Sequence, residues 1–108
     1  MLSEYRPVWM LAMFDLPVAT KRQRRAATQF RQFLLRQGFQ MLQFSVYARY
    51  LDSADAAAEH ASRIRLMLPR EGEVRLLAVT DRQFGKMQVF SGKKRLPPEP
   101  PPPQLMLF

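Results

Sequence analysis

The spacing of apolar residues changes several times along the chain, and each change marks a new element. Residues 8–14 are all apolar, too few for a helix of their own, and are followed directly by Asp15. Such a run predicts a strand that is buried on both faces. In residues 21–37 the apolar side chains recur every three to four positions, which predicts a helix, and Thr20 and Gln23 form a capping-box pair at its start.

The rest of the pattern adds a pair of strands, a second helix and a last strand. Residues 39–51 alternate with a period of two, and their length predicts a bend or hairpin near Ser45. Residues 54–68 return to helical spacing, residues 74–80 form another apolar strand, and a short extra strand is predicted at residues 87–90. The order is an α+β split βαβ pattern (βαββαβ) around a four-stranded antiparallel sheet.

The first strand also predicts how the domain associates. Two helices cover only one face of a four-stranded sheet, yet residues 8–14 are apolar on both faces. A second copy of the chain packed on the uncovered face would bury it. The pattern therefore predicts a homodimer, without saying which face of the strand meets the helices.

The amino-acid composition of the chain changes at Leu96. Six of the nine prolines lie in residues 97–103. The sequence then ends in four apolar residues, Leu105, Met106, Leu107 and Phe108. We therefore expect one folded domain over residues 1–95 and an extended Pro-rich tail over residues 96–108, whose apolar end binds a partner or docks back onto the sheet.

The charge balance narrows the choice of partner. Seventeen Lys and Arg residues against nine Asp and Glu residues give a formal net charge of +8. This excess favours nucleic acid first and an anionic membrane surface second. The absence of cysteine excludes disulfides and thiolate metal sites. With no membrane-length apolar run and no signal-peptide pattern, we expect a cytoplasmic protein that does not enter a membrane.

The positive charge is concentrated in two segments without acidic residues, the predicted first helix and residues 82–95. A solvated helix face is the usual explanation of such a run, but here no acid lies three or four positions away to pair with the bases. The planar arginine fork suits phosphate, so both segments predict a nucleic-acid surface. Its residues are Lys21, Arg22, Arg24, Arg25, Arg31, Lys86, Lys93, Lys94 and Arg95.

Asp15 is the leading candidate for chemistry because it directly follows a buried strand. It is either a turn residue that bonds nearby backbone N–H groups or a ligand of Mg²⁺ or another divalent cation. One carboxylate is few for such a site, but a two-fold dimer would bring two copies of Asp15 together. The end of the first strand is expected to meet the bend near Ser45 within residues 39–51. The side chains expected beside Asp15 are therefore those of Ser45 and Tyr47. Asp81 also ends a strand, but antiparallel geometry places it at the opposite end of the sheet.

Several short motifs, taken together, resemble one known family. They are Met13-Phe-Asp-Leu-Pro17, the arginine-rich first helix, Gln43-Phe-Ser-Val-Tyr47, Leu68-Pro69 with Gly72-Glu-Val74, and Val79-Thr-Asp-Arg-Gln-Phe84. In this order and spacing the chain resembles the CRISPR-associated protein 2 family over nearly its whole length, in particular the versions found beside single-effector (type II) systems.

The resemblance implies a ferredoxin-like fold, a homodimer and a role in spacer acquisition. There the family's dimer bridges two dimers of the integrase, CRISPR-associated protein 1, and holds captured duplex DNA. The resemblance also implies a Mg²⁺-dependent endonuclease acting on RNA or DNA, with Asp15 at the position of the metal ligand, although integration in the family does not require cleavage. Two alternatives stay open: a free-standing toxin-like endoribonuclease, and an RNA-binding domain without catalysis.

Overall fold

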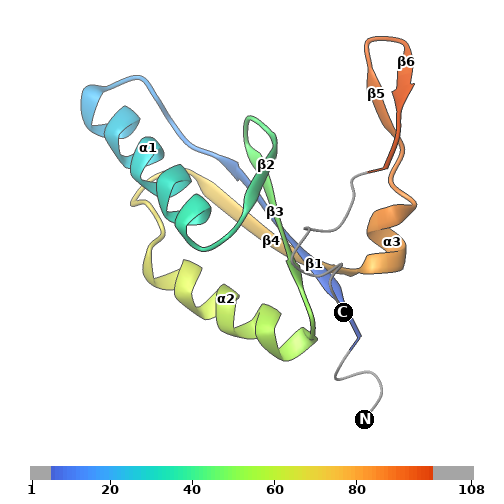
Figure 1. The fold of residues 1–108 in the computed structure, drawn as a ribbon. Coiled ribbons are helices and arrows are strands. Elements are labelled where there is room, and N and C mark those ends of the chain that lie inside the picture. Colours follow the sequence, from blue (N-terminus) through green and yellow to red (C-terminus); the bar gives the residue numbers. More distant parts are fainter. Residues whose placement is uncertain (1–5, 99–108) are drawn as a thin grey trace.

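A four-stranded antiparallel sheet with two helices on one face forms the centre of the protein in the computed structural model, which describes residues 6–98 (Figure 1). The strand order across the sheet is β2-β3-β1-β4. This is the predicted ferredoxin-like βαββαβ arrangement. Its elements are β1 (Val8–Asp15), α1 (Lys21–Arg36), β2 (Gln40–Gln43), β3 (Val46–Leu51), α2 (Ala54–Leu66) and β4 (Glu73–Thr80).

The first helix begins where its capping box predicts. The Thr20 hydroxyl accepts a hydrogen bond from the Gln23 backbone N–H at 3.1 Å, and Gln23 Oε1 accepts one from the Thr20 N–H at 2.9 Å. The helix ends at Arg36, and Gly38 follows with a φ of +85°, a left-handed conformation that suits glycine at a helix end. The second helix starts after Ser53 and ends two residues earlier than predicted.

The main core lies between the sheet and the two helices. Alternate residues of β1, among them Ala12 and Phe14, face Phe30 and Leu34 of α1. The rings of Phe14 and Phe30 meet edge to face at 5.4 Å. Tyr47 of β3 is buried in the same cluster, with its ring centre 5.5 Å from that of Phe14. The predicted burial of β1 is therefore confirmed on the face that the helices cover.

The other face of β1 is covered in part by the chain itself. Trp9 stacks on Phe84 with ring centres 4.0 Å apart, and its indole N–H donates to Asp81 Oδ1 at 2.9 Å. Phe84 and Asp81 belong to a short helix, α3 (Asp81–Gly85), which the sequence analysis did not predict. A second copy is therefore not needed at the Trp9 end of this face. Farther along, Leu77 of β4 stays 49% exposed.

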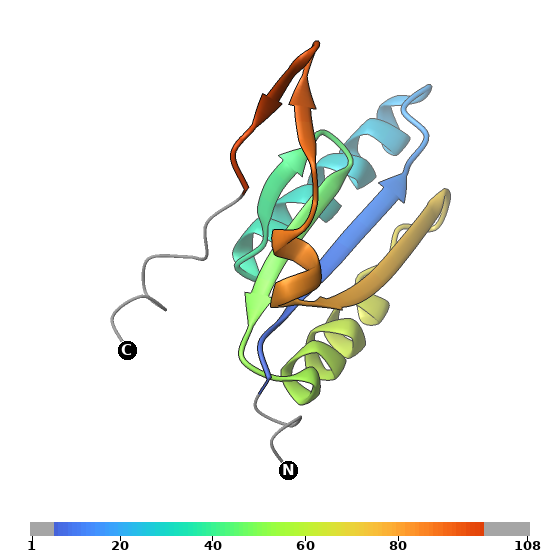
Figure 2. The ribbon, with the colours of Figure 1, turned by 90° about the vertical axis from the view of Figure 1, so that its right-hand side faces the viewer.

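A two-stranded hairpin follows α3 and replaces the single extra strand that was predicted. Its strands are β5 (Val89–Ser91) and β6 (Lys94–Leu96), joined by a turn in which Gly92 has a φ of +64°. Figures 1 and 2 show the hairpin standing away from the sheet, on the side opposite α1 and α2. The predicted apolar end of the tail, Leu105 to Phe108, lies outside the described residues. Within residues 6–98, no helix is long and apolar enough to cross a membrane.

Candidate metal and nucleic-acid site

Asp15 lies exposed at the end of β1, beside a second carboxylate. The register of β1 and β4 places Asp15 directly opposite Glu73, the first residue of β4. Directly opposite residues of an antiparallel pair project from the same face at close range. By the alternation of the strand, this is the face opposite α1 and α2. Glu73 was not among the predicted site residues, because the strand was expected to begin at residue 74 and its pairing with the first strand was not predicted.

A hollow of about 280 Å³, the Asp15 hollow, opens at this end of the sheet. It is lined by Met13, Phe14, Asp15, Ser45, Val46, Glu73 and Arg75. Ser45 reaches it because its backbone carbonyl accepts a hydrogen bond from the Phe14 N–H at 3.0 Å, which fixes the β2–β3 turn against the end of β1.

Tyr47 does not join Asp15, and its expected place beside the aspartate is corrected. Its side chain is buried on the helix-covered face of the sheet with Phe14, whereas Asp15 follows the opposite face. The bend after β2 brings the backbone of residues 45–47 close to Asp15. Strand alternation then sends the Tyr47 side chain into the core.

Arg75 places a positive charge in the same hollow, paired with Glu73. Its guanidinium lies 3.2 Å from Glu73 Oε1, and both side chains are largely exposed. Water screens such a pair, so it contributes little to stability. Its effect here is local: it lowers the negative charge that Asp15 and Glu73 present together.

The donor set fits a magnesium ion that is only partly held by protein. Within residues 6–98 no three His, Cys, Asp or Glu side chains gather closely enough to hold a metal. Asp15 and Glu73 nevertheless offer the hard oxygen ligands that Mg²⁺ prefers. Such sites commonly use one or two carboxylates and complete the shell with water and phosphate oxygens. A second copy of Asp15 from a dimer mate would serve the same purpose.

Asp81 plays no part at this end of the sheet. Thr80 pairs with Val8, so Asp81 lies at the other end of β1, as antiparallel geometry predicts. It starts α3, where a negative charge favours the helix, and its carboxylate holds Trp9.

The basic residues of α1 differ in how free their side chains are. Lys21, Arg22 and Arg25 are exposed near the start of the helix. Arg24 is exposed too, but its guanidinium donates to the carbonyls of Val18 and Ala19 at 3.1 Å each. Arg31 lies with its guanidinium carbon 4.6 Å from the centre of the Phe44 ring and 5.8 Å from that of Phe14. These two arginines therefore hold neighbouring loops as well as carrying charge.

The second basic group is separated from the first by the sheet. Its four residues, Lys86, Lys93, Lys94 and Arg95, are exposed on the end of α3 and on the hairpin. The two views show this group and α1 on opposite sides of the sheet (Figures 1 and 2). One described chain therefore does not bring the two groups together into a single patch.

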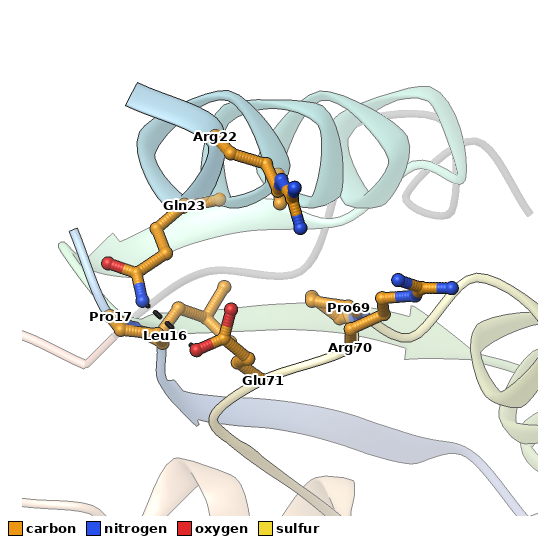
Figure 3. A pocket seen from close by; sticks show the side chains of 9 residues that line it. Leu16, Pro17, Arg22, Gln23, Pro69, Arg70 and Glu71 are labelled. Atoms are coloured by element: carbon orange, nitrogen blue, oxygen red, sulfur yellow. Dashed lines mark hydrogen bonds between the residues drawn. The ribbon is translucent and has the colours of Figure 1, made fainter. Parts of the chain in front are cut away.

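A smaller pocket, of about 90 Å³, lies beside the start of α1 (Figure 3). Arg22 of α1 and Arg70 of the α2–β4 loop both line it, and we refer to it as the Arg22–Arg70 pocket. Arg70 was not among the predicted binding residues, because it lies outside both acid-free segments.

Fold and site together define a ferredoxin-like α+β domain with a strand-end aspartate and a basic first helix. Residues 8–87 match the family described as CRISPR associated protein Cas2. The chain therefore belongs to the Cas2 family.

Relatives with the name "CRISPR-associated endoribonuclease Cas2" cover most of the chain. The protein from Flavobacterium psychrophilum is 45% identical over 107 residues, covering 99% of this chain and 93% of its own. The protein from Parvibaculum lavamentivorans is 48% identical over 101 residues, which cover 94% of this chain and 100% of the relative. The protein from Acidovorax ebreus is 53% identical over 83 residues, which cover 77% of this chain and 81% of the relative.

Proposed function

We propose that this protein acts in CRISPR spacer acquisition, as a homodimer that binds duplex DNA and bridges dimers of the integrase, CRISPR-associated protein 1. We also propose that Asp15 forms a Mg²⁺-dependent endonuclease site, for which RNA is the favoured substrate because relatives are named endoribonucleases. The observation that carries the proposal is the exposed, acid-free start of α1, close in the chain to the strand-end carboxylate of a Cas2-family fold.

Three features of the described chain support a homodimer. The outer edge of β4 pairs with no strand among residues 6–98. Leu77, on the face not covered by α1 and α2, is half exposed. The β5–β6 hairpin stands apart from the sheet, and an isolated two-stranded hairpin is only marginally stable in water. A second copy would cover the exposed face and the free edge together.

The proposed chemistry assigns a role to each group at the end of β1. Asp15 and Glu73 would hold the ion, which when bound activates water and neutralises charge on the scissile phosphate. Arg22 and Arg25 bind backbone phosphates and orient the nucleic acid along α1. Ser45 borders the hollow and can hydrogen-bond a phosphate oxygen.

Reconstitution with the integrase tests the proposal directly. We expect the purified protein to form a stable complex with the integrase and to support integration of a short duplex into a CRISPR array. We expect Asp15→Asn to support integration equally well while losing cleavage of RNA. The adaptor role would be rejected if no complex forms, whereas RNA cleavage by the protein alone without integrase binding would favour the toxin-like alternative.

A further inference from the structure

The Arg22–Arg70 pocket combines an apolar floor with two guanidinium groups from different elements. Leu16, Pro17 and Ala26 form part of the floor, between the end of β1 and the first turns of α1. Figure 3 shows the Arg22 side chain reaching down from α1 above the pocket and the Arg70 side chain extending to the right from the α2–β4 loop. Two arginines that line one small opening favour an anion, and an apolar floor favours an anion with an apolar part attached.

The one acidic residue that lines the pocket, Glu71, is hydrogen-bonded to a neighbour other than the two arginines. Glu71 Oε2 accepts a hydrogen bond from Gln23 Nε2 at 3.0 Å, and Figure 3 shows its carboxylate directed toward Gln23. Gln23 is itself fixed, because its Oε1 accepts from the N–H groups of Ala19 and Thr20 at 2.9 Å each. The capping-box residue Gln23 of α1 thus holds one oxygen of the Glu71 carboxylate.

We propose that the Arg22–Arg70 pocket binds one phosphodiester of the nucleic-acid backbone, with the phosphate between the two arginines and the adjoining sugar on the apolar floor. The proposal rests on the proposed nucleic-acid binding and extends it to Arg70 and to a defined position. Charge complementarity supports it, since α1 carries no acid and the chain has a net charge of +8.

The position of the pocket relates the bound phosphate to Asp15. A third hollow, of about 400 Å³, shares Pro17 and Glu71 with the Arg22–Arg70 pocket and shares Asp15 and Glu73 with the Asp15 hollow. The three openings therefore adjoin one another along the end of the sheet. A strand anchored at the pocket continues toward Asp15, so the pocket sets which phosphodiester reaches the carboxylate.

Charge variants test whether the two arginines hold the same phosphate. Binding of a fluorescent duplex is measured against salt for the wild type, Arg22→Gln, Arg70→Gln and the double variant. We expect Arg70→Gln to weaken binding about tenfold, the loss expected of one charge-assisted contact. The slope of log K against log salt should flatten by about 0.9 in the double variant if one phosphate is shared, and by about 1.8 if there are two. Arg65→Gln, on the exposed surface of α2, is the charge-matched control.

A volume variant tests the floor without changing any charge. Ala26→Leu would fill the pocket, whereas Thr28→Leu places the same side chain on an exposed part of α1. We expect Ala26→Leu to weaken binding several-fold and Thr28→Leu to have no effect. Thermal unfolding of each variant confirms that the domain is intact.

The outcomes separate this inference from the proposed function. Wild-type affinity in both Arg70→Gln and Ala26→Leu, with binding still lost in Arg22→Gln/Arg25→Gln, would overturn the pocket alone. A wild type that binds neither duplex DNA nor RNA would overturn both. Inorganic phosphate at matched ionic strength should compete no better than chloride. Displacement by millimolar phosphate would reassign the pocket to the free ion and overturn the proposal.

Discussion

At the scale of single residues, two aspartates in similar sequence positions have different surroundings. Asp15 and Asp81 each adjoin the end of a strand, but Asp81 is held by the Trp9 indole while Asp15 adjoins Glu73 in an open hollow. Two neighbouring carboxylates repel each other unless a cation lies between them. This difference in environment makes Asp15 the candidate metal ligand.

Exchanging each aspartate for asparagine tests this assignment. Asp15→Asn should abolish Mg²⁺-dependent cleavage and weaken Mn²⁺ binding, measured by calorimetry, while leaving the melting temperature nearly unchanged. Asp81→Asn should leave cleavage and Mn²⁺ binding intact. It should lower the free energy of unfolding by about 1 kcal/mol, because it weakens the hydrogen bond from Trp9. Undiminished cleavage by pure Asp15→Asn protein would falsify the site.

Gly72 sets the position of the Asp15 backbone. It has a φ of +91°, and a Cβ at this position would lie 2.6 Å from the Asp15 carbonyl oxygen. Gly72→Ala should therefore lower the free energy of unfolding by about 2 kcal/mol and weaken Mn²⁺ binding. Gly85→Ala is the matched control, because no atom beyond its chain neighbours and its own helix backbone lies within 4 Å of its Cβ position, and we expect it to be neutral or slightly stabilising. Equal stability of the two variants would contradict the prediction.

His60 makes stability depend on pH. Burial lowers its pKa below the usual 6.5, the charges of Arg49 and Arg63 lower it further, and Glu59 opposes them. The folded state then holds fewer protons than the unfolded state below pH 6.5, so the free energy of unfolding falls as the pH drops. His60→Gln should lose less stability between pH 7.5 and pH 5 than the wild type does, as measured by urea unfolding. Parallel pH profiles would contradict this.

At the scale of elements, local signals could be predicted and long-range packing could not. The capping box of Thr20 and Gln23 placed α1 correctly, and the same signature at Thr80 and Gln83 marks α3, the helix that was not predicted. The length of residues 39–51 predicted the turn near Ser45, but their alternation did not predict that Tyr47 faces the core. That outcome depends on which face of the sheet the helices cover, which is decided by contacts between residues far apart in the chain.

The docking of α3 on the sheet should be measurable through Trp9, the protein's single tryptophan. Phe84→Ala removes the ring stacked on it, so the free energy of unfolding should fall by about 3 kcal/mol and the Trp9 emission should shift to the red. Phe90→Ala, on the exposed face of β5, should change neither. An unchanged spectrum in Phe84→Ala would show that α3 does not cover the indole.

At the scale of the whole molecule, the sheet separates the two basic groups and leaves one face partly uncovered. In a homodimer, the hairpin of one copy can reach surfaces of the other, so the two groups need not act within one chain. The dimer is also what would pair two copies of Asp15. Both properties depend on the uncovered face around Leu77, where β4 meets β1.

Leu77→Glu tests this face with little cost to the monomer. Leu77 is already 49% exposed, so a charge there should leave each folded chain intact, unlike a charge at Leu11, which is buried. If a second copy covers Leu77, the variant must bury a carboxylate at the interface, and we expect the dimer to dissociate at micromolar concentration. Leu66→Glu, at a position 84% exposed on α2, should remain dimeric. Light scattering measures the mass of each variant and of the wild type. A wild type that is a monomer would contradict the proposed dimer and the pairing of two Asp15 carboxylates that depends on it.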